Sequence, residues 1–204
     1  MILDLSTLTP SQVYANLVQT IIPRPIAWVL SENKEQNLNL APYSYFNAVC
    51  SAPPLLMISV GRKPDGTPKD TKVNIEERGH FVIHLVDETT LDDMNTSSLT
   101  LDYGDSEVSR LGLKTVDFEG FSLPRLEKAN IAFACTRYQI LQLGDSPQSV
   151  IFGLIHQVYI NDAVIGEDAK GRMKVLADKV KPIGRMGAGE YVSFGTTIRK
   201  PRPE

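Results

Sequence analysis

The stretch PRPIAWVLSENKEQNLNLAPYSYFN, residues 23–47, decides the fold class. Proline pushes the residue before it into extended backbone, so a helix that precedes Pro23 must end there. Residues 26–31 are almost all apolar and predict a strand with apolar side chains on both faces. The polar residues 32–37 indicate a turn, and the return strand is expected to start over residues 38–41.

Four more segments carry the features of strands. Residues 55–61 are nearly all apolar, as in a strand buried on both faces, and the parity of apolar residues changes within 130–144, which predicts a bulge. The other two segments are 80–86 and 149–160, and GDSPQ (144–148) is expected to form a hairpin turn. Strands dominate and do not alternate with helices. This pattern favours an antiparallel barrel or sandwich, and no GxGxxG follows a strand, which excludes a Rossmann fold.

The helices are expected to be short and to begin at capping residues. Thr9 is followed by Pro10, which suits the first helical position. Asp70 is interpreted as the cap of a second helix, accepting an N–H from near Val73, and this helix should close near Gly79. The expected starts are Thr9, Asp70 or Thr71, Thr89 or Thr90, and Glu107.

Composition narrows the classes of function. The chain has 204 residues, 42% hydrophobic, and a net charge of -3, as expected for one globular domain without a broad basic field. Nucleic acid and anionic membranes are therefore poor candidate partners. The N-terminal residues 1–10 contain Asp4 but no basic region or long apolar run, so we expect no signal peptide or transmembrane helix and a cytoplasmic location. Cys50 and Cys135 are expected to be buried free thiols, with one disulfide as the alternative.

Lys69 and Thr71 form a candidate anion site. The N-terminus of a helix offers free N–H groups and the positive end of the dipole, and these two residues add an ammonium and a hydroxyl. A phosphate would suit this arrangement. An ordinary capped surface helix is the alternative, and it is favoured when the segment is judged alone.

The segment NLAPYSYFN (39–47) offers the groups that a flavin ring requires. Asn39, Ser44 and Asn47 could bind its pyrimidine edge, while Tyr45 and Phe46 offer flat apolar surface. A buried strand and turn with these aromatic side chains in the core is an equally good interpretation of the segment alone.

The remaining candidates are weaker. His80 and His84 share one face of a strand, but no third metal ligand is near them in sequence, so a metal site is not predicted. Neither cysteine has a nucleophile signature and GxSxG is absent, so nothing supports a hydrolase. In GRMGAGEY (184–191), Arg185 and Tyr191 could reach a ligand or a dimer partner, and a glycine-rich surface turn is the alternative.

Together these motifs resemble one family. PRPIAWV, NLAPYSYFN, PPLLMISVG, KDTKVNI, MNTSS and GRMGAGEY occur in this order from about residue 23 to 191. The series resembles the flavin reductase-like family, including flavoredoxin and related FMN-binding split-barrel proteins. The resemblance implies a mainly β fold, a six-stranded antiparallel split barrel of Greek-key order with short flanking helices. It also implies one FMN for each subunit of a homodimer, near the subunit interface.

The resemblance also assigns residues and boundaries. One FMN-binding domain is expected over 1–204, with an N-terminal helical extension (1–22) and a C-terminal tail (192–204). No side chain is expected to be catalytic, because FMN carries the chemistry. The expected cofactor-binding residues are Asn39, Ala41, Ser44, Asn47, Ser59, Gly61, Arg62, Lys69, Thr71 and Arg185.

The leading hypothesis is an oxidoreductase that transfers a hydride from NADH or NADPH to flavin, with an electron-acceptor protein as a further partner. One alternative is an electron carrier of the flavoredoxin kind without strong NAD(P)H activity. The other is a split-barrel binding or dimerisation module that has lost its cofactor.

Overall fold

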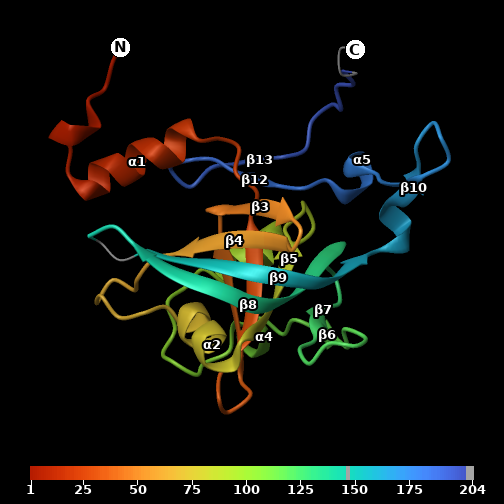
Figure 1. Cartoon of the computed structure of the whole chain (residues 1–204), viewed down its shortest axis with the longest axis horizontal. Helices are drawn as coiled ribbons and strands as arrows, with labels where there is room; N and C mark the ends of the chain where they lie inside the picture. Colours follow the sequence, from red (N-terminus) through yellow and green to blue (C-terminus); the bar gives the residue numbers. More distant parts are fainter. Residues whose placement is uncertain (146–147, 201–204) are drawn as a thin grey trace.

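The computed structural model describes residues 1–145 and 148–200. Its centre is a sheet of seven antiparallel strands in the order β2-β1-β5-β8-β9-β4-β3 (Figure 1). Hairpins pair β1 with β2, β3 with β4, and β8 with β9, whereas β5 pairs with β1 and β9 with β4 across long stretches of sequence. The strands are β1 (Ala27–Glu32), β2 (Leu38–Tyr43), β3 (Phe46–Ser51), β4 (Pro54–Val60), β5 (His80–Leu85), β8 (Ile131–Leu143) and β9 (Gln148–Ile160).

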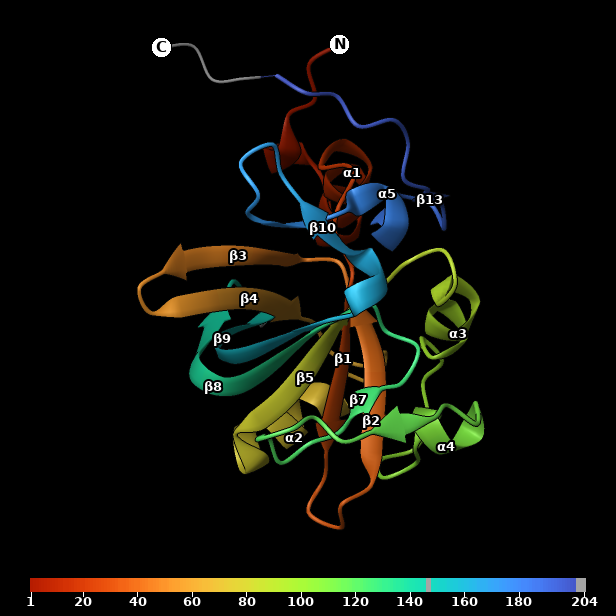
Figure 2. The same ribbon diagram turned by 90° about the vertical axis from the view of Figure 1, so that its right-hand side faces the viewer.

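The sheet has one strand more than the six expected. The additional strand is β3, which pairs with β4 and is exposed along nearly its whole length. Because neither face of β3 is buried, its sequence lacks the apolar pattern by which the other strands can be predicted. The backbone N–H of Ser59 donates to the carbonyl of Tyr45 at 2.8 Å, so β4 also meets the end of β2. Figure 2 shows β3 and β4 lying across the direction of β1 and β2.

The core confirms that β1 is buried on both faces. Ala27 and Val29 belong to a cluster that includes side chains of β4, β5, β8 and β9. Trp28 and Leu30 belong to a second cluster, which includes Met94 and is closed by side chains from residues 108–129. The strand therefore separates two hydrophobic cores. The predicted bulge of β8 is present between Arg137 and Gln139, and a second shift of register occurs opposite Ala134 and Cys135, where β9 holds the extra residue. The turn expected at 144–148 includes Ser146 and Pro147, which lie outside the described residues.

Most of the predicted helix boundaries are confirmed. Thr9 caps α1 (Pro10–Thr20) through a capping box, and Gly79 ends α2 (Asp70–Arg78) with a φ of 77°. The predicted Asp70 cap is wrong, because Lys69 is the N-cap and makes no side-chain cap hydrogen bond. Asp70 is instead paired with Lys63 at 2.7 Å, since the preceding loop brings this lysine to the start of the helix. The other short helices are α3 (Leu91–Thr96), α4 (Glu107–Arg110) and α5 (Ala177–Val180). Thr90 is the N-cap residue of α3, as expected, although its hydroxyl bonds Asp87 and makes no cap hydrogen bond.

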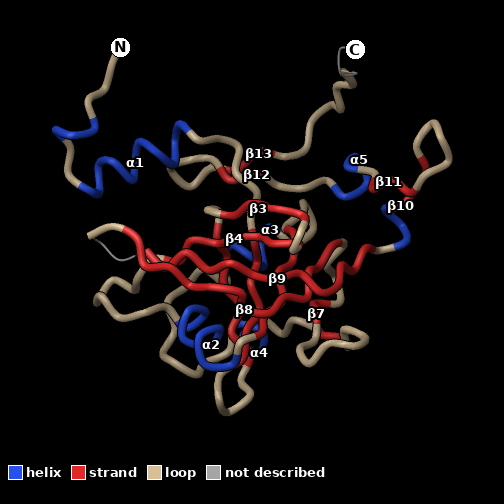
Figure 3. Tube along the Cα trace, viewed as in Figure 1, coloured by secondary structure: helices blue, strands red, loops and turns tan. Residues whose placement is uncertain are grey.

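The two terminal segments lie side by side over one end of the barrel (Figures 1 and 3). Here α1 runs beside the hairpin of β12 (Gly184–Arg185) and β13 (Tyr191–Val192). A side chain at Gly187 would collide with Gln19 of α1, and one at Gly184 would collide with Pro23. These glycines therefore allow the close approach for which the sequence suggested them. Small hairpins are formed by β6 (Thr115–Val116) with β7 (Arg125–Leu126), and by β10 (Ile165–Glu167) with β11 (Met173–Val175).

Both cysteines are free thiols, and only one of them is buried. Cys135 lies in the core, whereas Cys50 is exposed on β3, contrary to expectation. Cys50 is exposed for the same reason that β3 was not predicted, since no part of the chain that the structure describes covers this strand. No helix among the described residues combines the length and the apolar composition needed to cross a bilayer.

Candidate functional site

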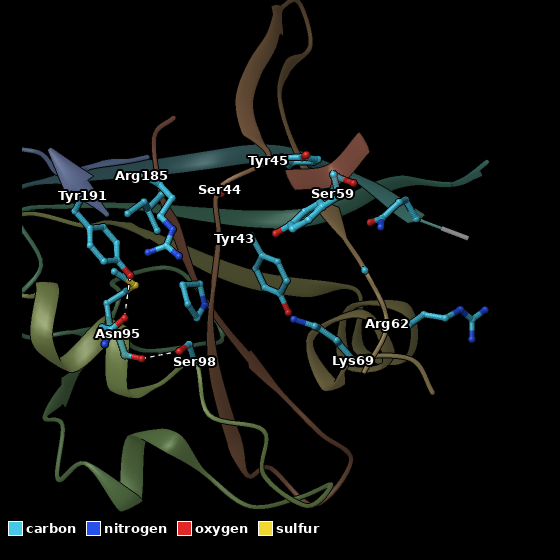
Figure 4. Close-up of a pocket in the computed structure, with 16 residues that line it drawn as sticks. Tyr43, Ser44, Tyr45, Ser59, Arg62, Lys69, Asn95, Ser98, Arg185 and Tyr191 are labelled. Atoms are coloured by element: carbon cyan, nitrogen blue, oxygen red, sulfur yellow. Dashed lines mark hydrogen bonds between the residues drawn. The ribbon is translucent and has the colours of Figure 1, made fainter. Parts of the chain in front are cut away.

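Two adjoining cavities open at the end of β2. The larger has a volume of about 430 Å³ and the smaller of about 330 Å³, and Pro42, Tyr43, Arg62 and Lys69 line both. These volumes fall in the range of small-molecule sites. Figure 4 shows the larger cavity, whose wall is Tyr14, Ile26, Pro42, Tyr43, Ser44, Tyr45, Ser59, Gly61, Arg62, Lys69, Met94, Asn95, Ser98, Gln148, Arg185 and Tyr191.

The predicted residues divide between the two cavities. The larger is lined by Ser44, Ser59, Gly61, Arg62, Lys69 and Arg185. Asn39, Ala41 and Thr71 line the smaller one, together with Arg62 and Lys69. Asn47 lines neither. It is exposed on β3, and its Oδ1 accepts the backbone N–H of Ala48 at 2.8 Å.

Lys69 is a half-buried cation at the start of α2. Burial lowers the pKa of its ammonium; the negative charge of Asp70 opposes this shift, and the nearby Lys63 adds to it. Among the described residues, no carboxylate lies within 4 Å of Lys69 Nζ, and the neighbouring Asp70 is engaged with Lys63. The positive end of a nine-residue helix adds to the same field. An anion would offset the cost of holding this ammonium away from water.

Tyr43 supplies a second polar group that needs a partner. Its hydroxyl is the single buried side-chain polar atom without a hydrogen bond among the residues that the structure describes. Burial raises the pKa of Tyr43, against a smaller opposite effect of the neighbouring Thr71 side chain, so the hydroxyl stays protonated and can donate. Thr71 is therefore the group within the chain that lies nearest to serving as its partner. Figure 4 shows it pointing toward Lys69, whose Nζ lies 5.5 Å from the centre of the tyrosine ring. An unpartnered donor beside an unpartnered cation suits the phosphate of a nucleotide.

Asn39 supports the site from behind. Its Nδ2 donates to Thr71 Oγ1 at 2.9 Å and to Ser31 Oγ at 3.3 Å, and Asn74 Nδ2 also donates to Ser31 Oγ, at 3.2 Å. Because Thr71 accepts this bond, its own hydroxyl hydrogen remains available as a donor. Asn39 therefore fixes Thr71, and it does not reach the larger cavity.

Arg62 stabilises the loop between β4 and α2. Its guanidinium donates to the carbonyl of Gly66 at 2.7 Å, and in Figure 4 the side chain extends away from Tyr43 and Lys69. Arg62 thus forms part of the rim of both cavities while its charge is directed into its own loop.

The opposite wall is aromatic and comes from distant segments. The Arg185 guanidinium lies 4.4 Å from the ring centre of Tyr191, whose hydroxyl donates to Asn95 Oδ1 at 2.9 Å. Tyr14 of α1 lies near Tyr45, with 6.4 Å between ring centres. Sequence reasoning identified Arg185 and Tyr191 but missed Tyr14, Tyr43 and Gln148. The segment 39–47 contains Tyr43 and could have indicated it, whereas nothing marks Tyr14 or Gln148.

The two strand histidines lie outside the cavities. His84 is fully buried, with Nδ1 3.1 Å from the Trp28 carbonyl and Nε2 accepting the Leu126 N–H at 2.9 Å. His80 contacts the Glu32 carboxylate through Nε2 and Ser122 Oγ through Nδ1. Both histidines thus link elements of the fold.

Comparison with known proteins agrees with this architecture. The sequence model described as the flavin reductase like domain matches residues 19–177, and the chain belongs to this family. An uncharacterized protein of Halalkalibacterium halodurans is 34% identical over 98% of this chain and 96% of its own.

Solved structures extend the comparison. Nitrilotriacetate monooxygenase component B from Bacillus cereus is 34% identical with a TM-score of 0.89, and the match covers 98% of each chain. The Pseudomonas fluorescens 2-nitrobenzoate 2-nitroreductase is 33% identical with a TM-score of 0.87, over 100% of this chain and 96% of the other. Flavoredoxin of Desulfovibrio vulgaris, at 19% identity and a TM-score of 0.74 over 98% and 97%, shares the fold.

Proposed function

We propose that the chain is an FMN-binding oxidoreductase of the flavin reductase type. The observation that carries the proposal is that the Tyr43 hydroxyl, which has no hydrogen-bond partner, lies close to the half-buried Lys69. Both groups are at the junction of the two cavities. Membership of the flavin reductase-like family supports a flavin as the ligand.

The junction is the proposed phosphate site. Lys69 contributes charge, Tyr43 and Thr71 contribute hydroxyl donors, and the N–H groups of Asp70 and Thr71 precede the first intrahelical bond, which Lys72 donates to the Lys69 carbonyl. Asn39 keeps Thr71 in place from the interior. A phosphate here would satisfy donors that have no partner among the described residues.

The larger cavity is the proposed site of the flavin ring. Ser44 and Ser59 supply hydroxyl groups, and Arg185 with the tyrosines supplies flat surface and positive charge. FMN, when bound, would accept a hydride from NADH or NADPH and pass the electrons to an acceptor. The residues of the cavity wall would hold the flavin ring and orient it. None of them is required to transfer a proton.

The proposed assembly is a homodimer. Large apolar side chains are exposed on β3 and on the outer part of β8, including Val49, Tyr138 and Leu143. Tyr14 of α1 is exposed beside the cavity. A second copy covering this surface would shield it from water and border the flavin site. Light scattering on the purified protein measures this directly.

A titration tests the proposed activity. The purified protein is titrated with FMN while flavin fluorescence is followed, and NADH and NADPH are then added separately without oxygen. We expect one FMN per chain and bleaching of the flavin absorbance by a nicotinamide nucleotide. Absence of FMN binding would contradict the proposal and favour the cofactor-free module. Binding without reduction by either nucleotide would favour the electron carrier.

An aromatic acceptor is a second candidate for the final step. The wall of the larger cavity includes Tyr14, Tyr45 and Tyr191 together with the cation of Arg185, which would suit an aromatic ring that carries a negative charge. The relative from Pseudomonas fluorescens is a 2-nitrobenzoate nitroreductase. Steady-state oxidation of the nicotinamide nucleotide with and without 2-nitrobenzoate distinguishes this role from reduction of flavin alone.

A further inference from the structure

Arg24 is a buried arginine that sits where three distant segments meet. Only 6% of its surface is exposed. Its backbone pairs with that of Arg185 on β12, with N–H donated in both directions at 3.0 and 2.8 Å. Its side chain does not line the larger cavity, but its partners belong to the segments that do.

The guanidinium binds neutral oxygens from all three segments. Nη1 donates to the carbonyls of Val18 and Ile21, each at 2.6 Å, at the C-terminal end of α1. Nη2 donates to the carbonyl of Met186 at 3.0 Å, just after β12. Nε donates to Ser44 Oγ at 3.3 Å, in the turn between β2 and β3. A planar, rigid donor suits this arrangement, and a lysine could not reach all four acceptors at once.

The contact with Ser44 fixes the direction of a hydrogen bond. A serine hydroxyl has one hydrogen to donate, and it cannot direct this hydrogen at a guanidinium, which only donates. Because Ser44 accepts from Arg24 and its side chain lines the larger cavity, its hydrogen is free for a group inside that cavity. The acceptors of Arg24 carry no formal charge, so its positive charge also adds to the potential at this wall.

We infer that Arg24 is a positioning residue, which joins α1, the Ser44 turn and β12 into one wall and sets Ser44 as a donor toward the bound ligand. The identity of that ligand as FMN rests on the proposed function. Tyr14 and Arg185 reach the cavity from the two segments that Arg24 joins to the turn.

A double-mutant cycle on FMN affinity tests this inference. Arg24→Met is expected to weaken FMN binding about tenfold and Ser44→Ala about fivefold, as for the loss of a hydrogen bond to a charged group and to a neutral one. If Arg24 acts through Ser44, the double variant should bind within about twofold of Arg24→Met. The absorption maximum of bound FMN should shift in the same direction in both single variants. Arg172→Met, an exposed arginine paired with Asp168, is the matched control and should leave the affinity unchanged.

Two outcomes would overturn the role assigned to Arg24. One is an affinity of Arg24→Met within about twofold of the wild type, and the other is a double variant whose loss is the product of the single losses. If Arg24→Met does not fold, Arg24→Lys replaces it in the same cycle, because it keeps the charge and loses the fork of donors.

Hydrogen exchange on the FMN-free protein separates this inference from the proposed function. Arg24→Met should accelerate exchange in α1 and in residues 184–192, with β8 and β9 unchanged. Unchanged exchange in both segments would refute the assembly of the wall. If the wild type binds no FMN but Arg24→Met still accelerates exchange in both segments, the proposed function is refuted and the role of Arg24 in the wall is not.

Discussion

The interior of the fold holds two buried polar regions that differ in one respect. Around His84, each ring nitrogen has a partner within the chain, in the Trp28 carbonyl and the Leu126 N–H. Around Tyr43 and Lys69, a buried hydroxyl has no partner and a half-buried ammonium has no carboxylate within 4 Å among the described residues. The first region is complete in itself, whereas the second would be completed by the ligand of the proposed function.

The difference separates stability from binding. A polar group that is satisfied within the chain contributes to stability, and its loss strands its partners. A polar group left unsatisfied costs stability in the free protein and returns that free energy when a ligand arrives. Substitutions in the two regions should therefore have opposite signatures.

The largest effect is expected for His84→Leu. It leaves the Trp28 carbonyl and the Leu126 N–H buried without partners, and should lower the free energy of unfolding by about 4 kcal/mol. FMN affinity of the folded fraction should stay within about twofold of the wild type. Urea denaturation with a parallel FMN titration measures both. His156→Leu, at an exposed histidine bonded to Thr136, is the control. A large loss of affinity in His84→Leu would break the distinction between the regions.

Acid should act on the same region. Burial lowers the pKa of His84 to about 4, with smaller effects from the Trp28 carbonyl and Arg125. A histidine whose pKa is lower in the folded state contributes its full stability above about pH 6.5 and loses it as the pH falls toward 4. The loss between pH 7 and 4 should be about 3 kcal/mol. It is measured as the difference in pH dependence between the wild type and His84→Leu, and parallel curves would contradict it.

Lys69→Met should produce the opposite signature. Loss of the cation from the phosphate site is expected to weaken FMN binding about a hundredfold, equivalent to about 2.7 kcal/mol. The FMN-free variant should melt no lower than the wild type, because a half-buried ammonium without a carboxylate partner has been removed. Lys72→Met on the same helix, which breaks the pair between the partly buried Lys72 and the exposed Glu76, is the matched control and should leave affinity unchanged. A lower melting temperature in Lys69→Met would mean that Lys69 stabilises the free protein, as His84 does.

Tyr43→Phe removes one hydroxyl group from the Tyr43 and Lys69 region, and its expected effect is the smallest of the four. Removing the hydroxyl should weaken FMN binding about fivefold, as expected for one hydrogen bond. The free protein should be as stable as the wild type or slightly more so, since the hydroxyl has no partner in it. Calorimetry with and without FMN tests both statements. A less stable free variant would mean that the hydroxyl is satisfied within the chain.

Local signals in the sequence were sufficient for much of the fold. Residues 26–31 and 55–61 are apolar enough to predict strands, and Thr9 and Gly79 mark helix ends through chemistry that acts within a few residues. The identity of the second helix cap depended on a distant partner. Asp70 has the side chain of a cap, but Lys63 forms an ion pair with it.

The site could be predicted only where its residues occur in short motifs. Ser44 and Lys69 belong to such segments, and the structure places both at the larger cavity. Tyr14 and Gln148 reach the same cavity from α1 and β9, and no local pattern marks them. Arg24 belongs to the segment PRPIAWV, but its contacts with Ser44 and Met186 join segments far apart in sequence, which the motif alone does not reveal.

The outermost strand has a consequence for handling the protein. β3 is the last strand of the sheet, so its outer backbone groups are free to pair with another chain. Proteins usually protect such an edge with charge or proline, and the sequence FNAVCS of β3 has neither. The exposed thiol of Cys50 lies on the same strand. Loss by aggregation and by oxidation should therefore begin at one place. Cys50→Ser is the change that would improve storage, because it removes the thiol and leaves the apolar surface of the proposed dimer unchanged.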